Sequence, residues 1–520
     1  MTEVVKTEDT IVEIGPGPLR GNVANGVHSF KGIAYGEAVS GRRRWQRAMP
    51  VTPWTDIKDA TEYGPRAIQP ECHDMKVTSS EMEELMEEVG ASDDRWRAQS
   101  EECLTLSVWT PDPSRQRRLP VMFWCHGGKY FGETPPVSWF DGENLARSGD
   151  VVVVTVRHRV GTLGFLHLAD LPGGAEYEDA ANIGMLDMVD ALKWVKDNIE
   201  NFGGDPDNVT IFGESGGGMK VSVLLRMPEA EGLFHKAIVQ SGSQLKAGTR
   251  TEGTERTLAL MAELGLEPND IEGLLDVPSE HLVEAQIRLT PQLFTQRAGA
   301  HFVEFEPIVD GKTLPVGCFD QLGSPLSKEV PLLVGTCATE TTWFLSSVPG
   351  MFELDRAQMH KMVGGMLGAD SERVVGIYET GRPDATPTEI ALAITGDLIF
   401  RSKAIRMAEL NADHGGAPVY MYILGFETNA CGGKYRTPHT LDVPLVFAHP
   451  DHPILGSDPA RFIVSKQMSD AWTAFARTGH PYSDSLPYWP AYDTTTRATM
   501  HFDREPQVVL DPMSAERMVW

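Results

Sequence analysis

Several short stretches of the chain are apolar at nearly every position, without the alternation that a half-exposed strand shows. Residues 121–125 and 151–156 are the clearest examples. A strand buried on both faces has this pattern, because neither face meets water. Further short runs predicted as strands lie at residues 209–212, 237–239, 331–335 and 419–424. They alternate with helical patterns, which predicts an α/β fold with an open, doubly wound and mostly parallel central sheet.

Two other patterns complete the predicted layers. Between residues 184 and 202, apolar side chains recur at helical spacing, and the pattern stops at Gly203 and Gly204. Before the first buried run, residues 11–36 alternate short apolar groups with glycines. This alternation predicts a small antiparallel sheet of strands and hairpins near the N-terminus.

The longer stretches between the strands are predicted as helical insertions. Residues 250–330 and 351–415 are mostly helical in pattern and are expected to cover the C-terminal edge of the sheet. A third insertion, residues 72–103, contains an amphipathic helix whose apolar positions follow i, i+3, i+4 and i+7, namely Met82, Leu85, Met86 and Val89. Length alone would suggest roughly two to four domains. Because no stretch looks like a linker, residues 1–520 are predicted to form one domain.

Charge and composition narrow the class of protein. The net charge of −27 repels phosphate backbones, so nucleic acid is not an expected partner. No apolar run reaches the ~20 residues that a membrane span needs, and the first ten residues are polar and acidic, unlike a signal peptide. These features predict a protein without a membrane partner, either cytoplasmic or secreted with its leader removed. The six cysteines are too few for a disulfide scaffold and lack zinc-ligand spacing. Oligomeric state is left open.

The clearest chemistry lies in residues 209–218, Val-Thr-Ile-Phe-Gly-Glu-Ser-Gly-Gly-Gly. A predicted strand precedes the pattern G-x-S-x-G and a predicted helix follows it, so the serine falls on a sharp strand-to-helix turn. Such a turn strains the serine backbone and requires glycines beside it, because neighbouring segments approach too closely for a Cβ. The turn lifts the Ser215 hydroxyl above the sheet edge. It also puts the N–H of Gly216 at a helix N-terminus, where a developing oxyanion is favoured.

A serine hydroxyl is a weak nucleophile at neutral pH and needs partners. An imidazole must take its proton, an acid must fix the tautomer of that imidazole, and N–H groups must receive the oxyanion. In α/β-hydrolases these partners follow in the order serine, acid, histidine. The chain has 15 histidines, so spacing alone does not select the base. This chemistry requires no metal and no organic cofactor.

Further sequence blocks are spread over nearly the whole chain, at residues 30–35, 100–106, 126–128, 198–206, 213–217 and 470–479. The first reads F-K-G-I-A-Y and the second reads S-E-E-C-L-T-L. Together the blocks resemble the type-B carboxylesterase family, which includes the cholinesterases. The resemblance implies an α/β-hydrolase fold and a serine esterase that forms an acyl-enzyme.

The resemblance also implies the partners of the serine. It assigns the acid to Glu340, although both neighbours of Glu340 differ from the family pattern. It assigns the base to His439, which precedes an apolar run as it does in the family. His449 and His452 are close in sequence, but neither precedes such a run.

By the same resemblance, the oxyanion hole consists of the backbone N–H groups of Gly128, Lys129 and Gly216. Lys129 stands where the family has a third glycine, and the loop is one residue shorter. Only the backbone of Lys129 is needed there. Its ammonium therefore either points to solvent or faces the pocket, where it would favour an anionic acyl or leaving group.

Two contacts near the entrance are implied as well. A disulfide would join Cys72 to Cys103, although a reducing cytosol would leave two thiols. An ion pair would join Arg44 to Glu101. Trp96 lies near the position of the choline-binding tryptophan of cholinesterases, but its spacing differs, so choline esters are not predicted.

These observations predict hydrolysis of a small-molecule carboxylic ester, with Ser215 as nucleophile, His439 as base and Glu340 as acid. One alternative is acyl transfer to an alcohol or amine through the same residues. Another is a non-catalytic binding protein, as some members of the family are. All three matched positions hold competent residues, which favours an enzyme. The sequence does not identify the ester.

Overall fold

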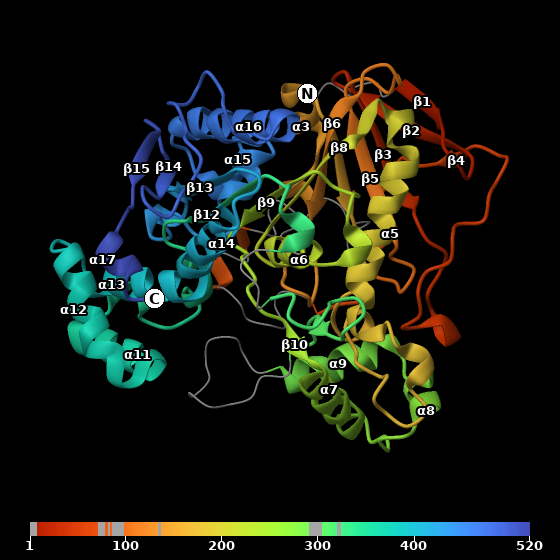
Figure 1. Cartoon of the computed structure of the whole chain (residues 1–520), viewed down its shortest axis with the longest axis horizontal. Helices are drawn as coiled ribbons and strands as arrows, with labels where there is room; N and C mark the ends of the chain where they lie inside the picture. Colours follow the sequence, from red (N-terminus) through yellow and green to blue (C-terminus); the bar gives the residue numbers. More distant parts are fainter. Residues whose placement is uncertain are drawn as a thin grey trace.

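One mixed β-sheet runs through the middle of the molecule (Figure 1). The computed structural model describes residues 8–70, 79–81, 84–85, 98–133, 137–290, 304–319 and 324–520. Thirteen strands of these residues form the sheet, in the order β1-β2-β3-β5-β7-β6-β8-β9-β12-β13-β14-β15, with β4 paired to β2. Their bounds are Glu8–Glu13 (β1), Pro18–Ala24 (β2), Val27–Ala34 (β3), Lys58–Asp59 (β4), Thr105–Thr110 (β5), Leu119–Cys125 (β6), Val152–Val156 (β7), Gly204–Glu214 (β8), Lys236–Gln240 (β9), Leu332–Cys337 (β12), Val419–Leu424 (β13), Ala498–Phe502 (β14) and Gln507–Leu510 (β15).

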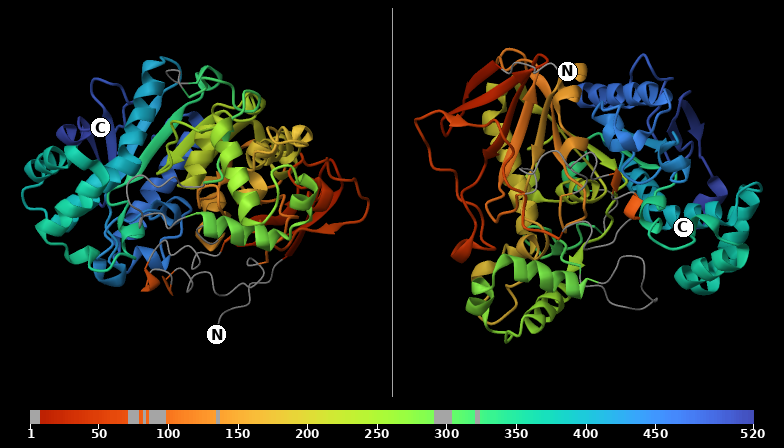
Figure 2. Two further views of the ribbon diagram at one scale, coloured as in Figure 1. Left: turned by 90° about the horizontal axis from the view of Figure 1, so that it is seen from below. Right: turned by 180° about the vertical axis from the view of Figure 1, so that it is seen from behind.

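The centre of this sheet is parallel and its edges are antiparallel. From β7 to β14 in that order, each strand runs parallel to the next one. The strands β1, β2, β3 and β5, and β15 at the other edge, pair antiparallel. Figures 1 and 2 show the N-terminal strands (red to orange) and the C-terminal strands (blue) on opposite sides of the molecule. The predicted parallel sheet and the small N-terminal antiparallel region are both confirmed.

The unbroken apolar runs are strands buried on both faces. Along β6, Val121 and Phe123 point into one hydrophobic core, and Met122 and Trp124 point into another. The first core also contains residues of α5 (Ile183–Asn198), α6 (Gly216–Leu224) and α14 (Ser402–Asp413). The second contains residues of α3 (Glu143–Gly149) and α16 (Ala460–Thr478). Helices therefore cover both faces of the sheet, as a doubly wound fold requires. The apolar pattern does not predict β5, because Thr and Ser interrupt it, although all six of its residues are buried.

Two of the insertions contain several helices among their described residues. The first contains α7 (Arg250–Glu263), α8 (Ile271–Asp276) and α9 (Ser279–Leu289). The second contains α11 (Arg356–Leu367), α12 (Ser371–Gly381) and α13 (Pro387–Gly396). Figure 1 shows the two groups at the same end of the molecule, on either side of its centre. In contrast, α14 packs against β12 and β13 and so belongs to the layer that covers the sheet.

The greater part of the third insertion, residues 72–103, lies outside the described residues, and so do Cys72 and Trp96. The predicted disulfide therefore stays a prediction. Cys103 itself is fully buried, and burial raises the pKa of its thiol to about 12. The one-domain organisation of residues 1–520 also stays a prediction.

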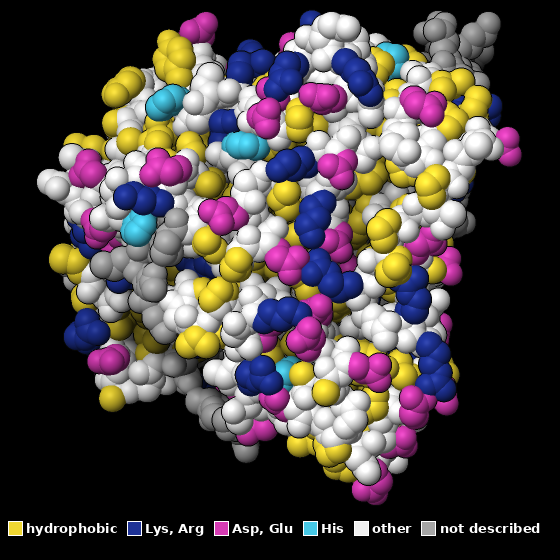
Figure 3. Space-filling model, turned by 45° about the vertical axis from the view of Figure 1, so that its right-hand side comes forward, with side chains coloured by type: hydrophobic (Ala, Val, Ile, Leu, Met, Phe, Trp, Pro, Cys, Tyr) yellow, Lys and Arg dark blue, Asp and Glu magenta, His cyan; other side chains and the backbone are white. Residues whose placement is uncertain are grey.

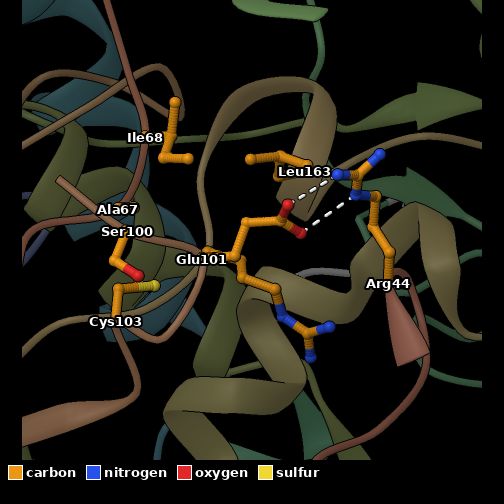
Figure 4. A pocket seen from close by; sticks show the side chains of 8 residues that line it. Arg44, Ala67, Ile68, Ser100, Glu101, Cys103 and Leu163 are labelled. Atoms are coloured by element: carbon orange, nitrogen blue, oxygen red, sulfur yellow. Dashed lines mark hydrogen bonds and ion pairs between the residues drawn. The ribbon is translucent and has the colours of Figure 1, made fainter. Parts of the chain in front are cut away.

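The predicted ion pair between Arg44 and Glu101 is confirmed (Figure 4). Arg44 Nη2 donates to Glu101 Oε1 at 2.6 Å, and Arg44 Nε donates to Oε2 at 2.9 Å. The third guanidinium nitrogen, Nη1, donates to the carbonyl of Val277 at 2.8 Å, just after α8. The bidentate pair thus ties the N-terminal part of the chain to the first helical insertion.

Charges are mixed on the surface. On the face shown in Figure 3, acidic side chains (magenta) and basic side chains (blue) are interspersed, so the negative net charge does not gather there in one patch. Within the described ranges, no helix combines the length and the apolar character needed to cross a bilayer.

Candidate active site

Four segments that follow parallel strands meet at one edge of the sheet. Residues 126–129 follow β6 and form what we call the oxyanion loop, and Ser215 follows β8. Glu340 and His439 come after β12 and β13, which are neighbours in the sheet. Because the carboxyl ends of parallel strands lie at the same edge, residues far apart in the sequence are brought to one place.

The strand-to-helix turn at residues 213–217, which we call the elbow, has the strained geometry that its motif predicts. Ser215 has φ 53° and ψ −120°, and its N–H donates to the carbonyl of Gln240 at 2.8 Å. A Cβ on Gly217 would lie 1.9 Å from the carbonyl oxygen of Cys125, and one on Gly213 would lie 2.6 Å from the same atom. The two glycines therefore allow the end of β6 to pack directly against the turn.

The predicted oxyanion donors are backbone groups without acceptors. Gly128 and Lys129 have φ values of 83° and 48°. Among the described residues, nothing accepts a hydrogen bond from the N–H groups of Gly128, Lys129 or Gly216. A Cβ on Gly216 would lie only 2.2 Å from the backbone nitrogen of Lys129, so the absence of a side chain there lets the loop close onto the elbow. Unpaired N–H groups beside the serine are what an oxyanion hole needs.

Glu340 and His439 form a buried carboxylate–imidazole pair. His439 Nδ1 lies 2.5 Å from Glu340 Oε2, and the two residues are 2% and 1% exposed. The other oxygen, Glu340 Oε1, accepts hydrogen bonds from Ser241 Oγ at 2.6 Å and from the Cys337 N–H at 2.7 Å. The carboxylate is thus held on one side, and its second oxygen fixes Nδ1 as the protonated nitrogen of the ring.

The remaining nitrogen of His439 faces the elbow. His439 Nε2 lies 3.2 Å from Oε1 of Glu214, the residue directly before Ser215. No hydrogen bond joins Ser215 Oγ to His439 among the residues that the structure describes. The structure therefore brings Glu340 and His439 into contact, whereas the contact between Ser215 and His439 stays a prediction.

Three buried carboxylates, those of Glu214, Glu340 and Asp442, favour the protonated form of the His439 imidazole. Burial disfavours the imidazolium, but Glu214 and Glu340 outweigh burial and raise the pKa of His439 to about 9. Burial raises the pKa of Glu214 well above its usual value, against the opposing effect of His439. The two groups therefore compete for one proton in a site that excludes water.

This competition predicts the pH dependence of activity. With His439 as the predicted base, which has to be unprotonated, activity should fall as the pH drops through its pKa. Glu214→Gln removes one of the carboxylates that favour the imidazolium, which lowers this pKa. The acidic limb of kcat/KM should move to lower pH by about one pH unit or more. One unit is the low end of the pKa shifts that an opposite charge at this separation causes. A pH–rate profile measures the limb, and an unchanged limb would contradict a charged Glu214.

The two other candidate histidines, His449 and His452, interact with residues away from Glu340. His449 Nε2 donates to the carbonyl of Asp141 at 2.9 Å. The His452 ring packs edge-on against Trp139, with 4.4 Å between the ring centroids. Neither ring contacts Glu340.

The side chain of Lys129 forms an ion pair with Glu304, and its exposed fraction is 31%. The charge that would attract an anionic acyl or leaving group is therefore already compensated by a carboxylate.

Sequence reasoning missed several residues around His439. The Phe344 and Phe400 rings stack on each other, with centroids 5.9 Å apart, and lie 5.0 and 4.8 Å from the imidazole. Phe400 belongs to a short π-helical segment, Asp397–Arg401, between α13 and α14. Such segments are frequent at functional sites but have no clear sequence pattern. Glu214 stands at the first x of G-x-S-x-G, where the motif specifies no residue type. The sequence signal for its role is therefore only its position directly before Ser215.

The whole chain is similar to known esterases. The model of the carboxylesterase family matches residues 8–520. A para-nitrobenzyl esterase of Bacillus subtilis is 35% identical over 98% of this chain and 97% of its own. A crystal structure of a Geobacillus stearothermophilus carboxylesterase aligns with TM-score 0.83 and 34% identity, over 98% of this chain and all of that one. An esterase from Clostridium hathewayi, described as able to hydrolyse aliphatic aromatic polyesters, aligns with TM-score 0.78 and 31% identity over 99% of both chains. The chain belongs to the carboxylesterase family and is a carboxylic ester hydrolase.

Proposed function

We propose that Ser215, His439 and Glu340 hydrolyse the ester by acyl transfer. His439 takes the proton of the Ser215 hydroxyl as its oxygen attacks the carbonyl carbon. Glu340 orients the imidazole and stabilises the imidazolium, and the unpaired N–H groups of the oxyanion loop and elbow receive the oxyanion. His439 then gives its proton to the leaving alcohol. A water molecule, activated in the same way, attacks the acyl-enzyme and releases the acid.

The observation that carries this proposal is the held carboxylate–imidazole pair beside a strained serine. Glu340 is fixed by two donors, and it contacts His439 Nδ1 at 2.5 Å. This leaves Nε2, which faces the elbow, as the nitrogen that accepts a proton. Catalytic hydrogen bonds are often long without substrate and tighten when it binds, so the missing bond to Ser215 is compatible with the proposal.

The proposed substrate is a small ester with an aromatic or bulky apolar group near the carbonyl. Phe344 and Phe400 form a stacked aromatic wall against the imidazole. Two of the similar proteins carry names or descriptions that mention a nitrobenzyl group or aromatic polyesters. An aromatic ring of the substrate would gain from an offset or edge contact with this wall.

A trapping experiment tests the proposal. A fluorophosphonate should inactivate the enzyme with one adduct per chain, and mass spectrometry should locate that adduct on Ser215. Hydrolysis of p-nitrophenyl benzoate should show a p-nitrophenol burst that is stoichiometric with enzyme, and free benzoate should be the main product even with added methanol. An adduct on another residue would contradict the proposed nucleophile, and methyl benzoate as the main product would identify an acyltransferase.

A further inference from the structure

A buried lysine lies next to the elbow and has no role in the mechanism above. Lys220 is on α6, five residues after Ser215, and its exposed fraction is 0%. Its Nζ donates to the carbonyl of His126 at 2.9 Å and lies 3.3 Å from Nδ1 of the same residue. His126 is the first residue of the oxyanion loop.

Within the described part of the chain, the charged form of Lys220 has no counter-charge beside it. No carboxylate forms an ion pair with Lys220 among the described residues, and Glu133, the carboxylate that acts on it from farther away, is already paired with Arg157. The other titratable groups that act on it or that it acts on are Cys125, His126 and His158. Burial lowers the pKa of Lys220 to about 7. A buried cation without a counter-charge destabilises a fold, so packing alone does not account for this lysine.

Two residues on the same face of α6, Gly216 and Lys220, both lie against the oxyanion loop. Gly216 and Lys220 are four positions apart and therefore lie on one face of α6. At the start of this face, Gly216 lies so close to Lys129 that an added Cβ would be 2.2 Å from its backbone nitrogen. One turn later, Lys220 holds the carbonyl of His126. The two contacts grip both ends of the oxyanion loop, residues 126–129.

The first residue of the loop is held from its other side as well. The His126 ring stacks on His158, with centroids 4.8 Å apart and planes at 16°. His126 Nδ1 donates to the carbonyl of Gly127 at 2.9 Å. Because the ring of His126 is already stacked on His158, Lys220 on α6 holds this residue through its backbone carbonyl.

We propose that Lys220 is a positioning residue for the oxyanion hole, which it aligns through its hydrogen bond to the His126 carbonyl. The inference rests on the proposed roles of the N–H groups of Gly128 and Lys129. An oxyanion hole stabilises the transition state only when its donors point at the developing charge. Loss of the Lys220 contact should therefore affect the transition state far more than the bound substrate.

Lys220→Met removes the donor and the charge and leaves an unbranched apolar side chain that is one atom shorter. We expect kcat for p-nitrophenyl butyrate to fall by about 10- to 100-fold, less than the 10²–10³ for removing an oxyanion donor itself. KM should stay within about twofold, because the loop stabilises the charge that develops in the transition state and not the neutral carbonyl of the bound ester. The Ki of an alkyl trifluoromethyl ketone, which forms a tetrahedral adduct with the serine, should rise by the same factor as kcat falls. The Tm should not decrease, because a buried unpaired charge is removed.

Two further variants complete the test. Lys220→Gln has the length of methionine but keeps an N–H donor, so its loss of kcat should be smaller than that of Lys220→Met. Lys236→Met is the matched control, because Lys236 is also a buried lysine, pairs with Asn208 and begins β9, at the end opposite to Gln240. It should keep wild-type kcat and Ki.

Unchanged kcat and Ki in Lys220→Met would overturn the inference. So would a loss of kcat that Lys220→Gln does not reduce, or one without a matching rise in Ki. If Lys220→Met does not fold, the comparison of Lys220→Gln with wild type, by kcat and Ki, decides the question. Failure of the proposed function is distinguishable, because the wild-type enzyme would then form no fluorophosphonate adduct on Ser215.

Discussion

Ser215→Ala is expected to lower kcat for p-nitrophenyl esters by about 10⁶-fold, the loss typical of removing a serine nucleophile. The variant lacks the oxygen that forms the acyl-enzyme, so the p-nitrophenol burst should vanish with the turnover. It should still fold, because the strained backbone at this position belongs to the turn and alanine has a smaller side chain than serine. Stopped-flow measurement of the burst and steady-state kinetics provide the two readouts.

Ser222→Ala is the control for this result. Ser222 lies on the same helix, and its hydroxyl donates to the carbonyl of Gly218 at 2.8 Å without touching the imidazole. This variant should keep kcat within about threefold and lose about 1–3 kcal/mol of stability, because the buried N–H of Gln244 also loses its acceptor. If Ser215→Ala retained more than about a thousandth of wild-type turnover, another nucleophile would have to be sought.

Glu340→Gln is expected to lower kcat by about 10⁴-fold, as amide replacement of the acid does in a serine protease triad. In this site the reason is geometric. Ser241 and the Cys337 N–H both donate to Oε1, so the amide oxygen of glutamine takes that position. The amide NH₂ group then faces His439 Nδ1, which has to become the acceptor. The proton moves to Nε2, and the ring is then unable to take the proton of Ser215.

Glu516→Gln tests whether the effect is specific to this carboxylate. Glu516 lies in α17 (Ser514–Arg517) and is also buried, at 3% exposure. Its carboxylate pairs with Arg382 at 2.7 Å. This variant should lower the Tm but leave kcat unchanged. NMR of the imidazole nitrogens should show the change of tautomer in Glu340→Gln, and a variant that kept both tautomer and kcat would rule out the role of Glu340.

Local sequence patterns predicted the scaffold well. The apolar runs of β6 and β7 identify strands with two buried faces, since such strands need no polar side. The G-x-S-x-G motif predicts the strained turn at Ser215, because only glycines tolerate the approach of Cys125. The prediction was less complete at β5, where buried Thr and Ser residues resemble an exposed strand.

The proposed partners of Ser215 were harder to predict. Glu340 and His439 are 99 positions apart, and no local pattern links them. Resemblance to a family selected them, and the parallel pairing of β12 with β13 brings their loops together. The rivals His449 and His452 lack the apolar run that follows His439, and the structure shows in addition that their rings interact with Asp141 and Trp139.

The sequence by itself determined the parallel core and the sharp turn that carries Ser215, because both depend on residue types at short spacing. Only the tertiary structure decided which charged groups surround that turn. Glu214 faces His439, Lys220 holds the oxyanion loop, and Lys129 is neutralised by Glu304. Each of these contacts depends on side-chain direction and on exclusion of water, which long-range packing sets and which no spacing along the chain encodes.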